Sequence, residues 1–165
     1  MLKIRFAFLI AAAAALFTAG ATTAQAQGLP AQKVLTMDAA SAIAHAAVDK
    51  CRADGYRVGV TVIDTGGMLK AFMRDDGSGP HTMGFSRRKA YTALTFKRTS
   101  AETGKAWLAN PPAPNIEGTV GTAGGVPIFA GKDVIGAVGV SGAPGGDKDE
   151  ACASAGIAKI ADLLK

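Results

Sequence analysis

Apolar and polar positions follow a helical period in the segment after Leu35, which predicts a first helix. Thr36 is its predicted N-cap, the helix runs to about Asp54, and Gly55 is its stop signal. One face of this segment is a continuous apolar stripe at helical spacing, formed by Ala40, Ile43, Ala44, Ala47, Val48 and Cys51. The stripe predicts a helix that packs one face against a core.

The pattern then changes to that of strands, and two runs around a glycine turn predict a hairpin. The runs are Arg57–Asp64 and Met68–Met73, and Thr65–Gly67 joins them. A polar segment over Asp75–Gly79 follows and predicts a loop.

Two helices are predicted after this loop. Residues 80–97 are expected to be helical, because the proline at position 80 suits the first turn of a helix. A shorter helix over 99–109 begins at Thr99 and Glu102, which have the spacing of a capping box. The proline-rich stretch over 110–115 predicts a loop.

A glycine-rich hairpin and a last helix complete the predicted elements. The two strands are Val126–Ala130 and Val134–Val140, joined by Gly131–Asp133. Asp147, followed three residues later by Glu150, has the pattern of an N-cap with its capping box and predicts the start of the last helix.

Three glycines recur every three residues along the last strand and its exit, namely Gly136, Gly139 and Gly142. Glycine weakens a strand unless another group approaches its backbone closely. The approaching group is expected to be a packed helix, a second subunit or a flat ligand.

The predicted order is helix, two strands, two helices, two or three strands, helix. Tight turns within each strand pair indicate a largely antiparallel sheet, and helices from both chain ends and the middle can cover both of its faces. The expected fold class is therefore α+β.

Five segments resemble one known family. They are Arg74–Gly77, Arg87–Ala93, Gly124–Ile128, Val134–Gly142 and Asp149–Ile157. In these segments the chain resembles the GlcG/HbpS-like family of haem-binding proteins, whose domain also forms the C-terminal part of PduO-type corrinoid adenosyltransferases. The resemblance covers roughly residues 35–165. It implies a profilin-like, three-layer α/β/α architecture with a sheet of about five strands.

The N-terminus has the pattern of a signal peptide. Lys3 and Arg5 form a basic region, Phe6–Phe17 is an unbroken apolar run, and Ala24–Ala26 is a small-residue cleavage site. The apolar run is shorter than the ~20 residues that span a bilayer. We therefore expect residues 1–26 to be removed, leaving residues 27–165 as a single domain in the periplasm or secreted. The alternative is that the segment stays uncleaved as a membrane anchor.

The formal net charge of the chain is +5, and its basic residues are concentrated in one region. Between positions 87 and 105 a single acid, Glu102, accompanies Arg87, Arg88, Lys89, Lys97, Arg98 and Lys105. This cluster is interpreted either as a solvated helix face or as an anion site for carboxylates such as haem propionates. Nucleic acid is not expected as a partner, because few aromatic residues accompany the cluster.

Two short segments resemble catalytic motifs, but neither is interpreted as a catalytic site. Asp64–Gly66 has the letters of the aspartic-protease turn, but such proteases need two aspartates and folds that are nearly all β. Gly139–Ala143 lacks one residue of the nucleophile elbow. The sequence has no C-x-x-C-H motif, which excludes covalent c-type haem but leaves non-covalent haem possible.

The candidate site is centred on His81, which follows Pro80 at the start of a predicted helix. Neutral imidazole is a good iron ligand. Phe85 and Arg88 follow on the same helix face, where a ring and a cation suit a porphyrin and its propionate, with Lys89 as a further cation. The alternative is that His81 only hydrogen-bonds the turn.

Other possible iron ligands have more ordinary interpretations. His45 falls on the polar face of the first predicted helix and is expected to be an exposed residue without a metal. Tyr91, Met68, Met73 and Met83 could also ligate iron, but these residues are more typical of core positions.

The resulting hypothesis is a haem (tetrapyrrole) binding protein that captures its ligand reversibly and without a covalent bond. Cobalamin is the alternative ligand, in a corrinoid-binding or accessory protein of glycolate-type metabolism. A structural oligomerisation module without a cofactor is the third possibility. Catalytic activity is not expected, a homo-oligomer is, and a membrane sensor or transporter is a further possible partner.

The two cysteines permit a disulfide. Cys51 lies near the end of the first predicted helix and Cys152 near the start of the last, so packing of these helices would bring the thiols together. An exported protein can keep such a bond. Cys152 lies off the apolar stripe of its helix, however, and the alternative is that both cysteines are small buried apolar residues.

Overall fold

The computed structural model describes Gly28, Leu29 and residues 31–110 and 116–165. The chain forms two units, Met1–Ala31 and Gln32–Lys165. The predicted signal peptide, its cleavage site and most of the proline-rich loop lie outside the described residues. In the described ranges, no helix has both the length and the apolar composition needed to cross a membrane.

All the elements in the described ranges belong to the second unit. In chain order they are α2 (Met37–Ala53), β1 (Gly59–Asp64), β2 (Leu69–Arg74), α3 (His81–Phe96), α4 (Ser100–Ala109), β3 (Gly125–Ala130), β4 (Asp133–Ser141), α5 (Gly146–Ala158) and the 3-10 helix η2 (Ala161–Leu164). The two predicted hairpins, β1–β2 and β3–β4, are confirmed.

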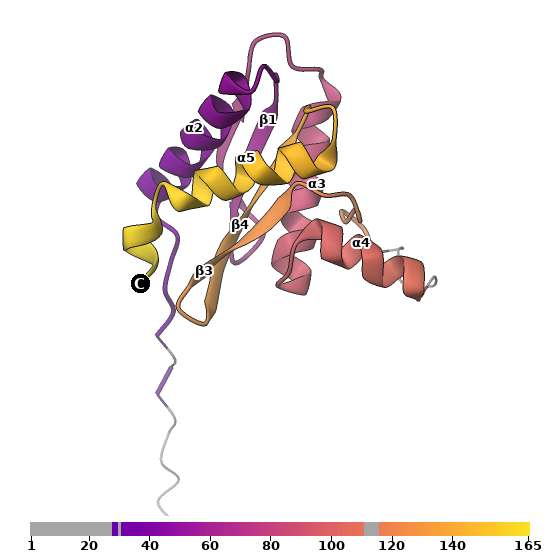
Figure 1. Cartoon of the computed structure of the whole chain (residues 1–165). Coiled ribbons are helices and arrows are strands. Elements are labelled where there is room, and N and C mark those ends of the chain that lie inside the picture. Colours follow the sequence, from indigo (N-terminus) through magenta and orange to yellow (C-terminus); the bar gives the residue numbers. More distant parts are fainter. Residues whose placement is uncertain (1–27, 30, 111–115) are drawn as a thin grey trace, which may run out of the picture. The chain divides into compact units, whose positions relative to one another are not determined.

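The strands form one antiparallel sheet in the order β2-β1-β4-β3 (Figure 1). The two hairpins join where β1 pairs with β4, with Val60 opposite Val140. The expectation of a mixed α+β fold is confirmed, but the described sheet has four strands rather than about five. Residues 116–124 add no strand, because Gly118 and Gly124 have φ of 78° and 120°, which an extended strand does not accommodate.

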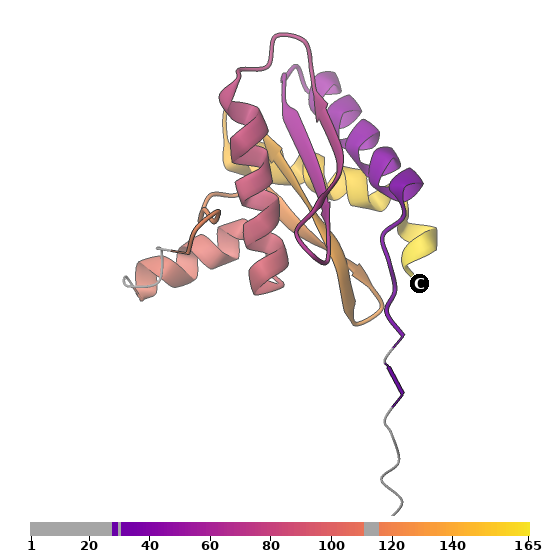
Figure 2. The same ribbon diagram turned by 180° about the vertical axis from the view of Figure 1, so that it is seen from behind.

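Helices α2 and α5 cover one face of the sheet and α3 covers the other (Figures 1 and 2). The apolar stripe of α2 is buried as predicted. It packs with α5 and with one side of the central strands, and the sheet and α5 residues of this core include Val60, Val62, Ile128, Val138, Val140, Cys152 and Ala153. On the opposite face, Ile63 and Ala137 pack against Ala90 and Ala93 of α3.

Gly139 explains part of the glycine repeat in β4. A Cβ atom at this position would collide with the carbonyl oxygen of Ser86 in α3 and lie 2.6 Å from the backbone nitrogen of Ala90. The backbone of β4 therefore touches the backbone of α3 at this point. Of the three groups predicted to approach the strand, the packed helix is the one found at Gly139.

The helix caps agree with the sequence at two of three positions. The Thr36 hydroxyl accepts a hydrogen bond from the Ala39 N–H, and Thr99 forms the predicted capping box with Glu102. The predicted cap at Asp147 is wrong, because Gly145 is the N-cap of α5 and no side chain caps it. The carboxylate of Glu150 instead accepts a hydrogen bond from the Gly124 N–H at 3.4 Å.

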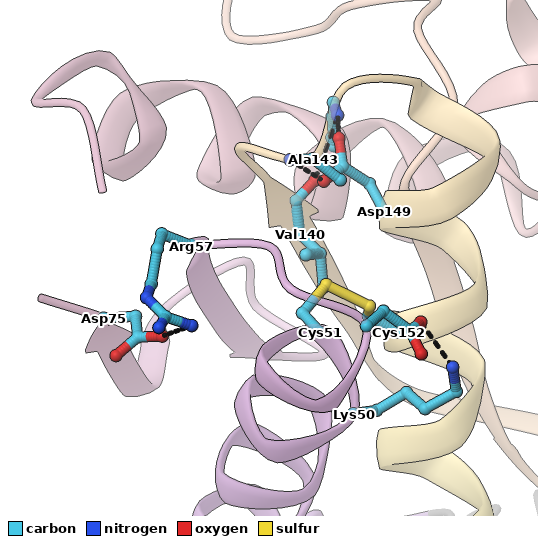
Figure 3. Close-up of a disulfide and its surroundings, with 10 residues drawn as sticks. Lys50, Cys51, Arg57, Asp75, Val140, Ala143, Asp149 and Cys152 are labelled. Atoms are coloured by element: carbon cyan, nitrogen blue, oxygen red, sulfur yellow. Dashed lines mark hydrogen bonds and ion pairs between the residues drawn. A yellow bond between two sulfur atoms is a disulfide. The ribbon is translucent and has the colours of Figure 1, made fainter. Parts of the chain in front are cut away.

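A disulfide joins Cys51 in α2 to Cys152 in α5, with the two Cα atoms 5.5 Å apart (Figure 3). Both side chains are fully buried where the two helices pack on one another. Of the two interpretations open from the sequence, the bond is therefore the one found. It closes a loop between residues 101 positions apart, which restricts the unfolded chain strongly.

The first prediction concerns the contact at Gly139. Gly139→Ala should destabilise the protein by about 1–3 kcal/mol, because the added methyl group forces α3 away from the sheet. Gly84→Ala on α3 is the matched control, since a Cβ atom there would meet open space and should add up to about 1 kcal/mol of helix propensity. Urea unfolding followed by circular dichroism measures both, and equal effects would contradict the packing argument.

The second prediction concerns the disulfide. Replacing both cysteines by alanine should lower the free energy of unfolding by about 2–5 kcal/mol. Thiol counting on the oxidised wild type under denaturing, non-reducing conditions should find no free thiol. Two free thiols per chain would show that the bond does not form.

Candidate functional site

The loop that leads into α3 is held by a buried carboxylate. Asp75 accepts hydrogen bonds from the guanidinium of Arg52, with Oδ1 2.6 Å from Nη2, and Arg57 Nη1 lies 3.7 Å from its Oδ2. The hydrogen bond from Arg52 lowers the pKa of Asp75 below its ordinary value. Asp75 thus ties the end of α2 to the segment before His81.

His81, Phe85 and Lys89 are four residues apart along α3 and line one cavity of about 240 Å³. His81 is exposed, Phe85 is half-buried, and Lys89 is buried. The opposite wall comes from the exit of β4 and the start of α5, over residues 141–146, together with Asp149. The structure therefore brings together three of the four predicted site residues.

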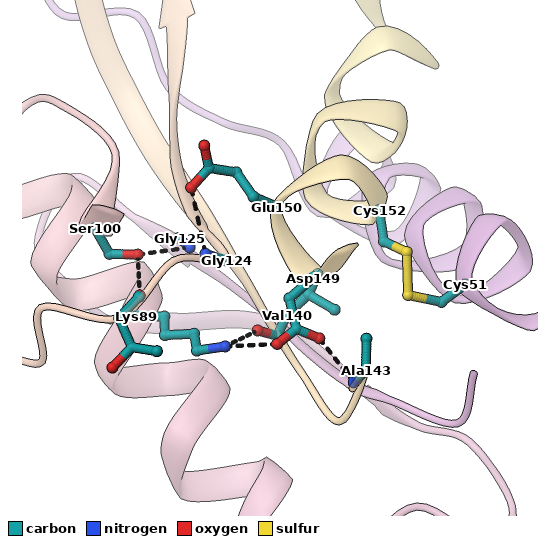
Figure 4. A network of polar contacts seen from close by, with 11 residues as sticks. Cys51, Lys89, Ser100, Gly124, Gly125, Val140, Ala143, Asp149, Glu150 and Cys152 are labelled. Carbon is teal, nitrogen blue, oxygen red and sulfur yellow. Dashed lines mark hydrogen bonds and ion pairs between the residues drawn. A yellow bond between two sulfur atoms is a disulfide. The ribbon is translucent and has the colours of Figure 1, made fainter. Parts of the chain in front are cut away.

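Lys89 is the most deeply placed of these residues. Only 1% of it is exposed, and its Nζ lies 2.7 Å from Oδ2 of Asp149 and 3.0 Å from the carbonyl oxygen of Val140 (Figure 4). The other carboxylate oxygen of Asp149 accepts a hydrogen bond from the Ala143 N–H at 3.0 Å. Burial raises the pKa of Asp149 above its ordinary value, and the hydrogen bond from Lys89 opposes that rise.

The sequence predicts Lys89 as a second cation, beside Arg88, for a carboxylate ligand. In the structure its ammonium group instead neutralises Asp149 and lies 5.2 Å from the centre of the Phe85 ring. Gly124 makes room for it, since a Cβ atom there would lie 2.8 Å from Nζ. Lys89 therefore forms the inner wall of the cavity and contributes there as half of an ion pair.

Arg88 lies on the exposed side of α3 and lines a neighbouring cavity of about 390 Å³ with Arg87, Tyr91 and Glu117. Its Nη2 donates to the carbonyl oxygen of Thr119 at 2.7 Å, and its guanidinium carbon lies 6.0 Å from the centre of the Phe85 ring. Phe85 thus has one cation on the inside and another on the outside. Such contacts favour a fixed ring orientation.

The other candidate iron ligands are dispersed. Tyr91 is half-buried beside Arg88. Met68 and Met83 are 64% and 58% exposed, so neither is the core residue that the sequence favoured. Met73 is partly buried and packs against the core on the α2 side of the sheet. His45 is exposed on α2, as expected. Among the described residues, no group of three or more His, Cys, Asp or Glu side chains could hold a metal ion.

A larger, mainly apolar groove of about 730 Å³ adjoins the His81 cavity, because Thr122 and Gly146 line both. We call it the α4 groove. Its walls are α4, the 121–123 segment and the first residues of α5, and its lining includes Ala101, Trp107, Leu108, Gly121 and Ala123. A flat apolar molecule bound at His81 would find further apolar surface here.

Asp149 is a member of the site that the sequence did not reveal. Its neighbours Asp147 and Glu150 have the spacing of a capping box, so the sequence pattern assigned roles to them and none to Asp149. A charged residue in the first turn of a helix is typically solvated, so the local sequence carried no sign of burial. Lys89 and Asp149 are 60 residues apart in the sequence, and only the folded structure brings them into contact.

Comparison with known proteins identifies the family. Residues 35–158 match the family model described as "Haem degrading protein HbpS-like". The chain is 33% identical to protein GlcG of Escherichia coli strain K12 over 115 residues, which are 66% of this chain and 81% of that protein. The chain therefore belongs to the HbpS-like family.

Solved structures agree with this assignment. A double mutant of Streptomyces reticuli HbpS is 38% identical, with a TM-score of 0.77 over 84% of this chain and 97% of that one. PduOC in complex with haem is 22% identical, with a TM-score of 0.71 over 78% of this chain and 96% of that one, and shares the fold.

The third prediction concerns the buried pair. Lys89→Met or Asp149→Asn should each lower the free energy of unfolding by about 3–5 kcal/mol, because each leaves one partner buried without its neutralising charge. Lys50→Met is the matched control: the Lys50–Asp54 pair is exposed on α2, and its loss should cost at most about 1 kcal/mol. Urea unfolding at pH 7 compares them. Equal losses for Lys89→Met and Lys50→Met would contradict the structural role of the buried pair.

Proposed function

We propose that this protein is an exported protein that binds haem reversibly and without a covalent bond. The observation that carries the proposal is the cavity in which His81 and Phe85 lie on one face of α3, next to the apolar α4 groove. Membership of a family described as haem-degrading and the haem complex of PduOC, which has the same fold, support the choice of ligand.

The side chains that line the His81 cavity suit haem as a ligand. The exposed imidazole of His81 is accessible and Phe85 offers a ring beside it. Haem, when bound, would supply an iron centre to which a neutral imidazole can bind. His81 would hold the iron, and Phe85 would contact the ring with its orientation fixed by the cations on either side.

Arg88 is the proposed partner for a propionate. It is exposed on the same helix, seven residues after His81, so the two side chains are roughly 10 Å apart along the helix axis. Lys89 is a weaker candidate for this role, since Asp149 and Val140 already occupy its ammonium group. Arg87 lines the same cavity as Arg88 and is the better placed second cation.

Export is proposed from the N-terminal sequence, and the disulfide supports it. Disulfides persist in oxidising compartments such as the periplasm or the extracellular space, and Cys51–Cys152 is such a bond. Reversible haem capture in such a compartment would serve sensing, storage or uptake. A membrane sensor or transporter is the partner we propose for that role.

The fourth prediction tests the haem site by absorbance titration with hemin. His81→Ala should shift the Soret band and weaken binding, since it removes the proposed iron ligand. His45→Ala is the matched control, because His45 is the other histidine of the chain, is also exposed and lies on α2. An unchanged spectrum and affinity in His81→Ala would place the ligand elsewhere, with Tyr91 next to be tested.

The same titration separates iron ligation from propionate binding. Arg88→Ala should weaken binding without changing the spectrum, and loss of a charge-assisted contact of roughly 1.5–3 kcal/mol corresponds to about a tenfold to hundredfold change in affinity. Arg74→Ala, at an exposed arginine on β2, is its control. A response to cobalamin in place of hemin would favour the corrinoid alternative, and a response to neither would favour a structural module.

A further inference from the structure

The imidazole of His81 lies against the backbone of Gly79. A Cβ atom on Gly79 would be 2.8 Å from both Nδ1 and Cε1 of His81 and 4.0 Å from Nε2, and these ring atoms are its three nearest neighbours. The missing side chain of Gly79 therefore leaves the space that the Nδ1–Cε1 edge of the ring takes. Nε2 is the ring nitrogen that lies farther from this backbone.

Two buried hydroxyl groups fix the position of Gly79. The carbonyl oxygen of Gly79 accepts hydrogen bonds from Thr82 Oγ1 at 2.7 Å and from the Thr82 N–H at 3.1 Å. Because the single hydroxyl proton of Thr82 is used there, Ser78 Oγ, 3.0 Å from Thr82 Oγ1, is the donor between the two hydroxyls. Thr82 is 0% exposed and Ser78 is 8% exposed, so this arrangement is shielded from water.

The turn before α3 is in turn attached to β1. The Asp75 N–H donates to the carbonyl oxygen of Val58 at 2.9 Å, and the Asp75 carbonyl oxygen accepts from the Ser78 N–H at 3.1 Å. The His81 imidazole takes no part in these hydrogen bonds of the turn. The interpretation that His81 only hydrogen-bonds the turn is therefore not supported within the described residues.

We propose that Gly79 is a positioning residue for His81, and that it favours the ring orientation in which Nε2 faces the ligand. This inference rests on the proposed function, because it assigns which nitrogen of His81 would hold the iron. The two nitrogens of an imidazole are chemically distinct, and the neighbours of a metal-binding histidine determine which one is offered. Residues that orient such a histidine commonly change metal affinity by about 10–100-fold.

Gly79 is needed for the imidazole rather than for the backbone of the turn. Its φ lies outside the left-handed region, whereas the φ of the neighbouring Gly77 is 78° and does require glycine. A methyl group added at Gly79 would first meet a side chain that can rotate about its own bonds. Gly79→Ala should therefore turn the His81 ring and leave the turn and α3 in place.

The fifth prediction tests the ring orientation without haem. The chain has two histidines, so proton NMR of the free protein should show two Hε1 signals, and loss of one in His81→Ala assigns them. Gly79→Ala should shift the His81 signal, because its added methyl displaces the ring, and leave that of His45 unchanged. Gly66→Ala is the matched control and should shift neither signal, since a Cβ atom in that exposed turn makes its nearest contact at an ordinary 3.4 Å.

An absorbance titration with hemin tests the consequence for binding. Gly79→Ala should shift the Soret band and weaken binding by about 10–100-fold, while its urea midpoint stays equal to that of Gly66→Ala. The double variant Gly79→Ala/His81→Ala should bind hemin as His81→Ala alone does, because the glycine acts only through the imidazole. A residue that merely stabilised the fold would not produce this non-additivity.

Three outcomes would overturn the role of Gly79 alone. They are an unchanged His81 signal in Gly79→Ala, a changed signal with unchanged hemin spectrum and affinity, and additive losses in the double variant. A hemin spectrum and affinity that do not respond to His81→Ala would instead overturn the proposed haem ligand, and the role of Nε2 with it. The NMR result separates these failures, because it is measured without hemin.

Discussion

The buried ion pair between Lys89 and Asp149 is the interaction on which this region of the fold depends. A lysine and an aspartate that are 1% and 3% exposed can remain charged only if each neutralises the other. The pair joins the middle of α3 to the first turn of α5, and the carbonyl of Val140 brings the end of β4 into the same contact. Elements from both sides of the sheet therefore meet at one point.

Several local features follow from that pair. Gly124 lies against the same cluster: its φ is 120°, and a Cβ atom there would lie 2.7 Å from the Val140 carbonyl oxygen and 2.8 Å from both Asp149 Cβ and Lys89 Nζ. Asp149 also fixes the exit of β4 by accepting the Ala143 N–H, so the loop that forms the far wall of the His81 cavity has a defined position. One turn after Asp149, Cys152 fastens α5 to α2 through the disulfide (Figure 4). The cavity is thus bounded by constrained backbone.

The pair also divides the basic segment of α3 into two parts with different roles. Lys89 faces inward and is neutralised, while Arg87 and Arg88 face solvent and keep their charge available to an anion. Phe85 lies between them, with a cation 5.2 Å away on one side and 6.0 Å away on the other. A buried pair of this kind adds little net stability compared with apolar residues of the same shape, but it is costly to break, so it specifies one arrangement of these helices.

The sequence by itself determined the secondary structure and the family. Apolar period, glycine turns and the caps at Thr36 and Thr99 are local signals, and they located both hairpins and the helices to within a few residues. Helical spacing also placed Phe85 on the same face of α3 as His81. It assigned Arg88 to that face, whereas in the structure Lys89 lines the His81 cavity and Arg88 lines a separate one. The cap assigned to Asp147 failed because Gly145, without a side chain, begins α5 with backbone geometry alone.

Tertiary structure alone decided which charged side chains are buried and whether the two cysteines form a disulfide. Lys89 and Arg88 are adjacent in sequence and look equivalent, yet their different environments come from Asp149, 60 residues away from Lys89, and from the glycines around it. The disulfide depends on how α5 lies across α2, which the position of Cys152 relative to its helix stripe left open. Burial, ion pairing and cross-linking depend on contacts between segments that are distant in the sequence. The local pattern of apolar and polar residues therefore cannot predict them.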